Sequence, residues 1–230
     1  MAYECKQCGY TSVEWLGRCP KCGDWDSFHQ EKTDEDTQKE RVVDEAPKPL
    51  SDISFDQKER IPTDIGEFDR VLGGGLIPGS VTLLGGDPGI GKSTLLLQAA
   101  ANIADRGKVL YISGEESSKQ LKMRAERLGL SSERLIIYSG QSLEAAVTHI
   151  NELEPICTIV DSIQSLQHTN SELSLGSTKQ VRELGREFTR IAKRKEIATL
   201  LIGHITKSGD FSGPKTIEHL VDSTIHFDGK

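Results

Sequence analysis

The sequence predicts an α/β protein in which a mostly parallel sheet is covered by helices on both faces, preceded by a small metal-binding module. Three features predict it: apolar runs that alternate with helical patterns, a glycine-rich loop after the first run, and paired cysteines within residues 1–30. Runs that are apolar throughout are typical of strands buried on both faces, as in parallel sheets. The runs cover residues 81–85, 109–113, 134–138, 156–161 and 197–203.

Composition excludes several classes of protein. The 230 residues suffice for one ordinary domain and a small one. No apolar stretch approaches the roughly 20 residues of a membrane-spanning helix, and the N-terminus lacks a signal-peptide pattern. A cytoplasmic protein with no membrane partner is therefore expected. The net charge of −7 argues against coating of nucleic acid by bulk electrostatics, although the distribution of charge matters more.

Residues 1–30 are predicted to form a four-cysteine zinc ribbon. Cys5 and Cys8 make one CxxC pair, and Cys19 and Cys22 make another after ten intervening residues. Two such pairs close a four-sulfur shell around a structural zinc ion, which stabilises a module too small for a sufficient core. Two disulfides are the alternative, and they persist poorly in a cytosolic protein.

Aromatic side chains of the ribbon have two interpretations. Trp15, Trp25 and Phe28 are expected to supply its small apolar face, whereas exposed aromatics could also stack on bases. The remaining cysteine, Cys157, lies within an apolar run and is expected to be an inert buried thiol.

An acidic, flexible linker is predicted over residues 31–50. This segment is highly charged and contains Pro47 and Pro49, so it cannot bury enough apolar area to fold alone. Residues 51–230 then form the α/β domain.

The glycine-rich loop at residues 86–93 matches the motif GxxxxGK[ST]. It lies between a predicted strand and a predicted helix, which is the order that a phosphate-binding loop requires. Glycines let backbone amides wrap a phosphate, and the helix N-terminus adds its positive end. Lys92 neutralises the β- and γ-phosphates, and the Ser93 hydroxyl can ligate Mg²⁺. The predicted nucleotide-binding residues in the loop are Gly86, Asp87, Pro88, Gly89, Ile90, Gly91, Lys92, Ser93 and Thr94.

Acidic residues end two further apolar runs. Asp161 has the pattern of a Walker B carboxylate, so it joins the nucleotide-binding residues and, with Ser93, the predicted magnesium site. Glu115 and Glu116 follow the run at 109–113, where a carboxylate can accept a proton from the attacking water. Glu115 is the first choice for this base and Glu116 the second. The alternative is that these acids only cap strands, or the helix that begins near Ser117.

His204 directly follows the run at 197–203 and is a catalytic candidate in addition to Lys92, Glu115 and Glu116. A lone histidine is more often structural. Its place at a strand end next to the nucleotide loop suggests that it senses the γ-phosphate or couples to the segment beyond it.

Basic residues downstream of Asp161 could follow a phosphate backbone. Arg182, Arg186 and Arg190 lie four residues apart on one face of a helix whose start, Ser177 with Gln180, resembles a capping box. The alternative is a solvated face, since Glu183 and Glu187 can pair with the arginines. Lys207 and Lys215, beyond His204, could contact nucleic acid or a neighbouring subunit's nucleotide.

Taken together, the four-cysteine ribbon, EFDRVLGGGLIPGSVTLLGGDPGIGKSTLLLQ, YISGEES, TIVDSIQS and LIGHITKSGDFSGPKTIEHLVDSTIHFDG resemble the RadA (Sms) family of bacterial DNA-repair ATPases. The resemblance runs along nearly the whole chain apart from the acidic segment. It implies a RecA-like P-loop ATPase core at 51–230, ring-shaped hexamers, and ATP-dependent movement on single-stranded DNA during recombination, with branch migration as the output. The implied cofactors are ATP, Mg²⁺ and Zn²⁺. By position in the matching motifs it supports Lys92, Ser93, Asp161 and Glu115, and it makes the loops after Asp161 and His204 the DNA-facing loops.

The chain departs from the family pattern at its end. Members of the family continue to a KNRFG motif and a domain similar to that of the Lon protease, and neither occurs in these 230 residues. If this is the whole molecule, hydrolysis across subunits and ring assembly are expected to be weakened. The alternative function is a nucleotide-gated module whose ribbon docks a recombinase or a replicative helicase, without DNA-stimulated hydrolysis.

Overall fold

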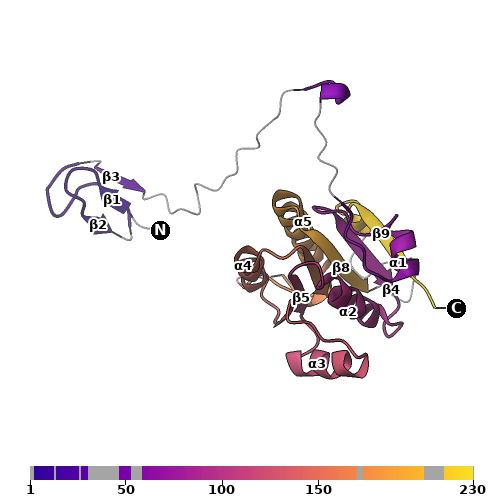
Figure 1. Ribbon diagram of the computed structural model, residues 1–230. Helices are drawn as coiled ribbons and strands as arrows, with labels where there is room; N and C mark the ends of the chain where they lie inside the picture. The colour runs from indigo at the N-terminus through magenta and orange to yellow at the C-terminus, as the bar shows by residue number, and fades with distance from the viewer. Residues whose placement is uncertain are drawn as a thin grey trace. The chain divides into compact units, whose positions relative to one another are not determined.

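The computed structural model describes residues 3–12, 14–25, 27–30, 47–52, 59–169, 173–204 and 215–229. The chain divides into two compact units, Met1–Phe55 and Asp56–Lys230 (Figure 1). The predicted acidic linker lies for the most part outside the described residues. None of the helices in the described part of the chain is long and apolar enough to span a membrane.

The first unit is a three-stranded antiparallel sheet of order β2-β1-β3. Its strands are β1 (Tyr3–Cys5), β2 (Thr11–Ser12) and β3 (Phe28–Gln30), and a short 3₁₀ helix, η2 (Leu50–Asp52), follows later in the unit. Cys5, Cys19 and Phe28 form its buried centre. The expectation for Phe28 is thus confirmed, but that for the tryptophans is wrong: Trp15 is 53% exposed and Trp25 70% exposed.

The second unit is built on a six-stranded sheet of order β6-β5-β7-β8-β4-β9, and every neighbouring pair is parallel. The strands are β4 (Val81–Gly86), β5 (Val109–Ser113), β6 (Leu135–Ser139), β7 (Cys157–Asp161), β8 (Ala198–His204) and β9 (Ser223–Phe227). Each predicted run lies within one residue of a strand. β9 was not predicted, because a partly exposed edge strand lacks the continuous apolar signal of the central strands.

Helices cover both faces of this sheet, as predicted (Figure 1). The helices are α1 (Gly66–Val71), α2 (Lys92–Ile103), α3 (Ser118–Arg127), α4 (Leu143–Leu153), α5 (Thr178–Lys195) and α6 (Lys215–Glu218), with a 3₁₀ turn, η3 (Ile163–Ser165). Successive residues of one strand point to opposite faces: Leu83 belongs to the core under α4 and α5, and Leu84 to the core under α1, α2 and α3.

The strand register brings the carboxyl ends of the central strands to one edge of the sheet. Ser113 at the end of β5 pairs with Asp161 at the end of β7, and Gly86 at the end of β4 pairs with His204 at the end of β8. Ligands of parallel α/β sheets bind beyond this edge. Cys157 lies at the opposite end of β7, where complete burial raises the pKa of its thiol to about 12. The prediction that this thiol is buried is confirmed, and its inertness stays a prediction.

Candidate nucleotide site and metal centre

The glycine loop between β4 and α2 adopts a backbone that side chains would obstruct. Gly91 caps the start of α2 in the left-handed region, at φ 112°. A Cβ on Gly86 would lie 2.3 Å from the carbonyl oxygen of Phe227 in β9. Gly91 must be glycine because of its left-handed conformation, and Gly86 must be glycine because β4 and β9 approach each other closely there. The amides of the first turn of α2, which include those of Ser93 and Thr94, point into this loop.

Lys92 is the positive charge at the centre of the loop. Its ammonium group donates hydrogen bonds to the carbonyl oxygens of Gly86 at 2.7 Å and Asp87 at 2.8 Å. Burial lowers the pKa of Lys92, and the carboxylates of Asp161, Asp87 and Glu115 act in the opposite direction. The negative charges of these three acids therefore favour the protonated, positively charged form of Lys92.

Asp161 is oriented by a residue that the motifs did not indicate. The hydroxyl of Tyr111, in the middle of β5, donates a hydrogen bond of 2.6 Å to Asp161 Oδ2. Both side chains are buried, and burial together with the neighbouring Asp161 raises the pKa of Tyr111 well above its ordinary value. The tyrosine thus remains a proton donor, and such a partner fixes the orientation of a metal-ligating carboxylate. The only sequence signal was a phenol hydroxyl in the middle of the apolar run before Glu115.

The two candidate bases have different surroundings. Glu115 accepts a hydrogen bond from the Ser162 hydroxyl at the end of β7, and its charge acts on Lys92. Glu116 forms a salt bridge with Arg124 of α3, and its N–H donates to the Ser113 hydroxyl at 3.0 Å. Glu115 therefore belongs to the group around Lys92, whereas Glu116 is engaged by α3.

For His204 and Lys215 the structure gives the position of the backbone, and Lys207 lies outside the described residues. His204 ends β8 beside Gly86, and Lys215 begins α6. Lys207 lies outside the described residues, so no contact of this residue bears on the prediction.

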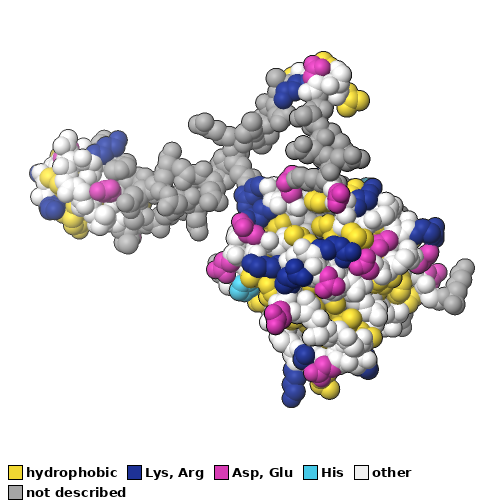
Figure 2. All heavy atoms as spheres, viewed as in Figure 1, with side chains coloured by type: hydrophobic (Ala, Val, Ile, Leu, Met, Phe, Trp, Pro, Cys, Tyr) yellow, Lys and Arg dark blue, Asp and Glu magenta, His cyan; other side chains and the backbone are white. Residues whose placement is uncertain are grey.

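Basic side chains line the exposed side of α5. Arg190 forms a salt bridge of 2.6 Å with Glu187, as the solvated-face alternative expects, and Lys193 pairs with Asp222 at 3.4 Å. Arg182 and Arg186 are exposed and form no salt bridge with any residue that the structure describes. Over the visible face of this unit, basic and acidic side chains are interspersed (Figure 2).

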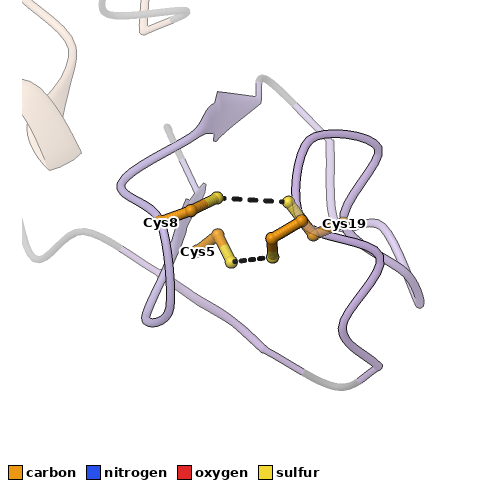
Figure 3. A group of neighbouring side chains, drawn as sticks. Cys5, Cys8 and Cys19 are labelled. Carbon is orange, nitrogen blue, oxygen red and sulfur yellow. Dashed lines mark hydrogen bonds between the residues drawn. The ribbon is translucent and has the colours of Figure 1, made fainter.

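The four predicted zinc ligands lie together in the first unit. Their sulfur atoms all lie within 4.8 Å of one another, and the Cys5–Cys22 and Cys8–Cys19 distances are both 3.6 Å (Figure 3). A tetrahedral zinc ion with bonds of about 2.3 Å requires sulfur atoms about 3.8 Å apart, so the group fits this metal. All four are free thiols. A hydrogen bond with the Ser27 hydroxyl lowers the pKa of Cys5 to about 6, whereas burial and the neighbouring thiols outweigh the Asp24 backbone and raise the pKa of Cys22 to about 12.

Family models match both units of the chain. A model described as an AAA domain covers residues 48–210, and one described as a rubredoxin metal binding domain covers residues 3–30. These matches agree with the predicted ATPase domain and with the predicted N-terminal metal-binding module.

The curated relatives carry one description, DNA repair protein RadA. The protein of Halalkalibacterium halodurans is 45% identical over 235 residues, that of Streptococcus pyogenes serotype M6 is 44% identical over 230, and that of Bacillus subtilis is 42% identical over 234. These alignments cover 98% or 99% of this chain and 51% of each relative. The chain thus spans about half the length of the curated relatives that it matches.

A solved structure described as an ATPase domain has a similar fold. The TM-score is 0.60 at 17% sequence identity, and the match covers 74% of this chain and 76% of that chain. The predicted α/β fold is therefore confirmed.

Proposed function

Since the chain belongs to the AAA-domain family and, within it, to the RadA DNA-repair proteins, we propose that it is the nucleotide-hydrolysing part of a motor that binds single-stranded DNA. The motor acts in homologous recombination and DNA repair by translocation of the branch-migration type. The observation that carries this proposal is the grouping of Lys92, Asp161 and Glu115 at the carboxyl edge of the sheet.

In the proposed mechanism, the loop at 86–94 holds the phosphates of ATP and Lys92 neutralises their charge. The Ser93 hydroxyl and the Asp161 carboxylate are oxygen donors of the kind that Mg²⁺ prefers, and Tyr111 keeps the carboxylate oriented. Mg²⁺ held by these oxygens would neutralise phosphate charge. Glu115 accepts the proton of the attacking water, and His204 senses the γ-phosphate from the neighbouring strand.

Residues 1–30 serve as the zinc ribbon, 31–50 as the acidic linker and 51–230 as the RecA-like ATPase domain. Arg182 and Arg186 contact the phosphate backbone, assisted by Lys207 and Lys215 from the segment beyond β8. The assembly is a homohexamer in the cytoplasm. The assignment of the DNA contact is supported by the relatives, which are described as DNA-repair proteins, and by the absence of acidic partners for Arg182 and Arg186 among the described residues.

The test measures ATP hydrolysis with and without single-stranded DNA. We expect DNA to stimulate turnover of the wild type. The double variant Arg182→Gln/Arg186→Gln should lose this stimulation and bind DNA more weakly, while hydrolysis without DNA persists. Arg127→Gln removes the same kind of charge from the exposed side of α3 and is the control. Turnover that DNA leaves unchanged in the wild type would refute the motor.

A second function, a nucleotide-gated docking module, is favoured by the exposed aromatics of the ribbon. Trp15 and Trp25 are more than half exposed, and the Arg18 guanidinium lies 5.6 Å from the centre of the Trp25 ring. Such groups are enriched at protein interfaces. A recombinase or a replicative helicase is the proposed partner. Single-turnover hydrolysis separates the two functions, because a pure switch binds ATP and shows no step accelerated by DNA.

A further inference from the structure

A buried serine holds the candidate base Glu115. Ser162 follows directly after β7, is completely buried, and donates a hydrogen bond of 2.5 Å from its hydroxyl to Glu115 Oε1. A general base must lie within hydrogen-bonding reach of the water that it activates. A residue that orients the carboxylate therefore affects the rate of hydrolysis without touching the nucleotide.

The turn that follows Ser162 is packed tightly against the end of β5. The Ser162 N–H donates to the Ser165 hydroxyl at 3.3 Å, and that hydroxyl donates to the Ser162 carbonyl oxygen at 2.7 Å. A Cβ on Gly114, the residue before Glu115, would lie only 2.1 Å from Ser165 Oγ. Because close-packed groups transmit displacement, a shift of η3 moves Glu115 as well.

A single side chain joins this turn to the start of α5. Gln180, in the first turn of the helix, is completely buried. Its amide nitrogen donates to the Leu166 carbonyl oxygen, and its amide oxygen accepts a hydrogen bond of 2.5 Å from the Gly176 N–H. Ser177 caps α5 as expected, but the Gln180 side chain bonds to Leu166 and Gly176 instead of completing a capping box.

We propose that Ser162 is a positioning residue for Glu115 and that Gln180 connects it to the helix that faces DNA. The inference rests on the proposed function, because it supplies the route by which DNA accelerates hydrolysis. Contact of single-stranded DNA with Arg182, in the first turns of α5, displaces Gln180 and with it Leu166. The turn η3 carries this displacement to Ser162, and Ser162 brings Glu115 into line with the attacking water.

The first experiment removes the hydroxyl. In the full chain, Ser162→Ala should lower the kcat of DNA-stimulated hydrolysis about tenfold, the scale expected when a catalytic group is displaced, and leave the KM for ATP unchanged. In a Glu115→Gln background, Ser162→Ala should have no further effect, because it acts only through that carboxylate. An equal additional loss in that background would overturn the assignment of Ser162.

The second experiment breaks the connection at Gln180. Gln180→Met preserves the size of the side chain and removes both hydrogen bonds. We expect the ratio of DNA-stimulated to basal hydrolysis to fall about tenfold and basal hydrolysis to persist. Gln167→Met is the matched control, since the Gln167 side chain makes no hydrogen bond with the described residues. If thermal unfolding shows that Gln180→Met is unfolded, Gln180→Glu keeps the acceptor for Gly176 and replaces the donor to Leu166 with a buried carboxylate oxygen.

The outcomes separate this inference from the proposed function. A wild type whose hydrolysis is insensitive to single-stranded DNA would refute the function itself. A wild type that DNA stimulates, with folded Gln180 variants stimulated to the same degree, would overturn only the connection proposed here. A double variant Ser162→Ala/Gln180→Met that loses no more stimulation than Ser162→Ala alone would support a single path, since residues of one network are not additive.

Discussion

At the scale of the residue, Lys92 is bound to the carbonyl oxygens of its own loop. The two hydrogen bonds to Gly86 and Asp87 satisfy a buried ammonium group that would otherwise lack partners. Phosphate oxygens of a nucleotide must therefore replace these carbonyls, and their negative charge favours the exchange.

Replacement of this lysine should abolish turnover. We expect Lys92→Ala to reduce ATP hydrolysis at least about a hundredfold, because the developing charge on the transferred phosphoryl group loses its neutralising partner. Initial rates of phosphate release measure this, with Lys119→Ala on α3 as the control. Turnover at the wild-type rate in Lys92→Ala would refute the assignment of the nucleotide site.

Tyr111 offers a test of how Asp161 is oriented. Tyr111→Phe removes only the hydroxyl that donates to Asp161, and we expect the Mg²⁺ concentration for half-maximal hydrolysis to rise about tenfold. A magnesium titration measures the shift. The control is Tyr138→Phe, because no described residue forms a hydrogen bond with the Tyr138 hydroxyl. An unchanged magnesium requirement would count against a role of Tyr111 at the metal site.

A substitution at Gly86 tests the contact between the glycine-rich loop and β9. Gly86→Ala places a methyl group against the Phe227 carbonyl oxygen, so the free energy of unfolding should fall by about 1–3 kcal/mol. Urea unfolding measures this change. Gly66→Ala is the control, since nothing lies within 4 Å of its Cβ.

At the scale of the element, we expect the ribbon to depend on a bound metal for stability and the larger unit to depend on the packing of its sheet. The buried centre of the ribbon contains two of the four cysteines and one phenylalanine, which is too little apolar area to stabilise three short strands. The larger unit has an apolar core on each face of its sheet. Loss of zinc should therefore unfold the ribbon alone.

Tryptophan fluorescence can follow this unfolding selectively. The chain has two tryptophans, Trp15 and Trp25, and both belong to the ribbon. We expect a strong chelator to release about one zinc ion per chain and change the tryptophan emission, while nucleotide binding persists. Zinc content well below one per chain would contradict the four-thiolate site, and loss of nucleotide binding would contradict the independence of the larger unit.

Most elements of the larger unit could be predicted because their signals are local. The apolar runs of the central strands and the Ser177 cap of α5 depend on neighbouring residues. β9 escaped prediction because its burial is partial, and its position beside β4 follows from the fold of residues far apart in sequence.

At the scale of the whole molecule, charge is distributed unevenly. The formal net charge is −7, yet α5 exposes Arg182 and Arg186, which have no acidic partner among the described residues. Under the proposed function, this surface would bind a phosphate backbone with release of counterions.

Salt should therefore weaken DNA binding without a comparable effect on hydrolysis in the absence of DNA. We expect the logarithm of DNA affinity to fall linearly with the logarithm of salt concentration, and the slope to become shallower in Arg182→Gln/Arg186→Gln. Fluorescence anisotropy of labelled single-stranded DNA measures both slopes. Identical slopes for the wild type and the double variant would exclude these arginines from the contact.

The sequence by itself determined the group of four cysteines, the glycine-rich loop, the central strands and the resemblance to RadA proteins, because each of these depends on spacing within a short stretch. Only the tertiary structure decided which acid lies with Lys92, which residue orients Asp161, and that the tryptophans of the ribbon are exposed. Tyr111 and Asp161 are separated by 50 positions, and Ser162 and Glu115 by 47. Contacts at such separations depend on strand order and register, which result from the packing of the whole sheet rather than from any local pattern.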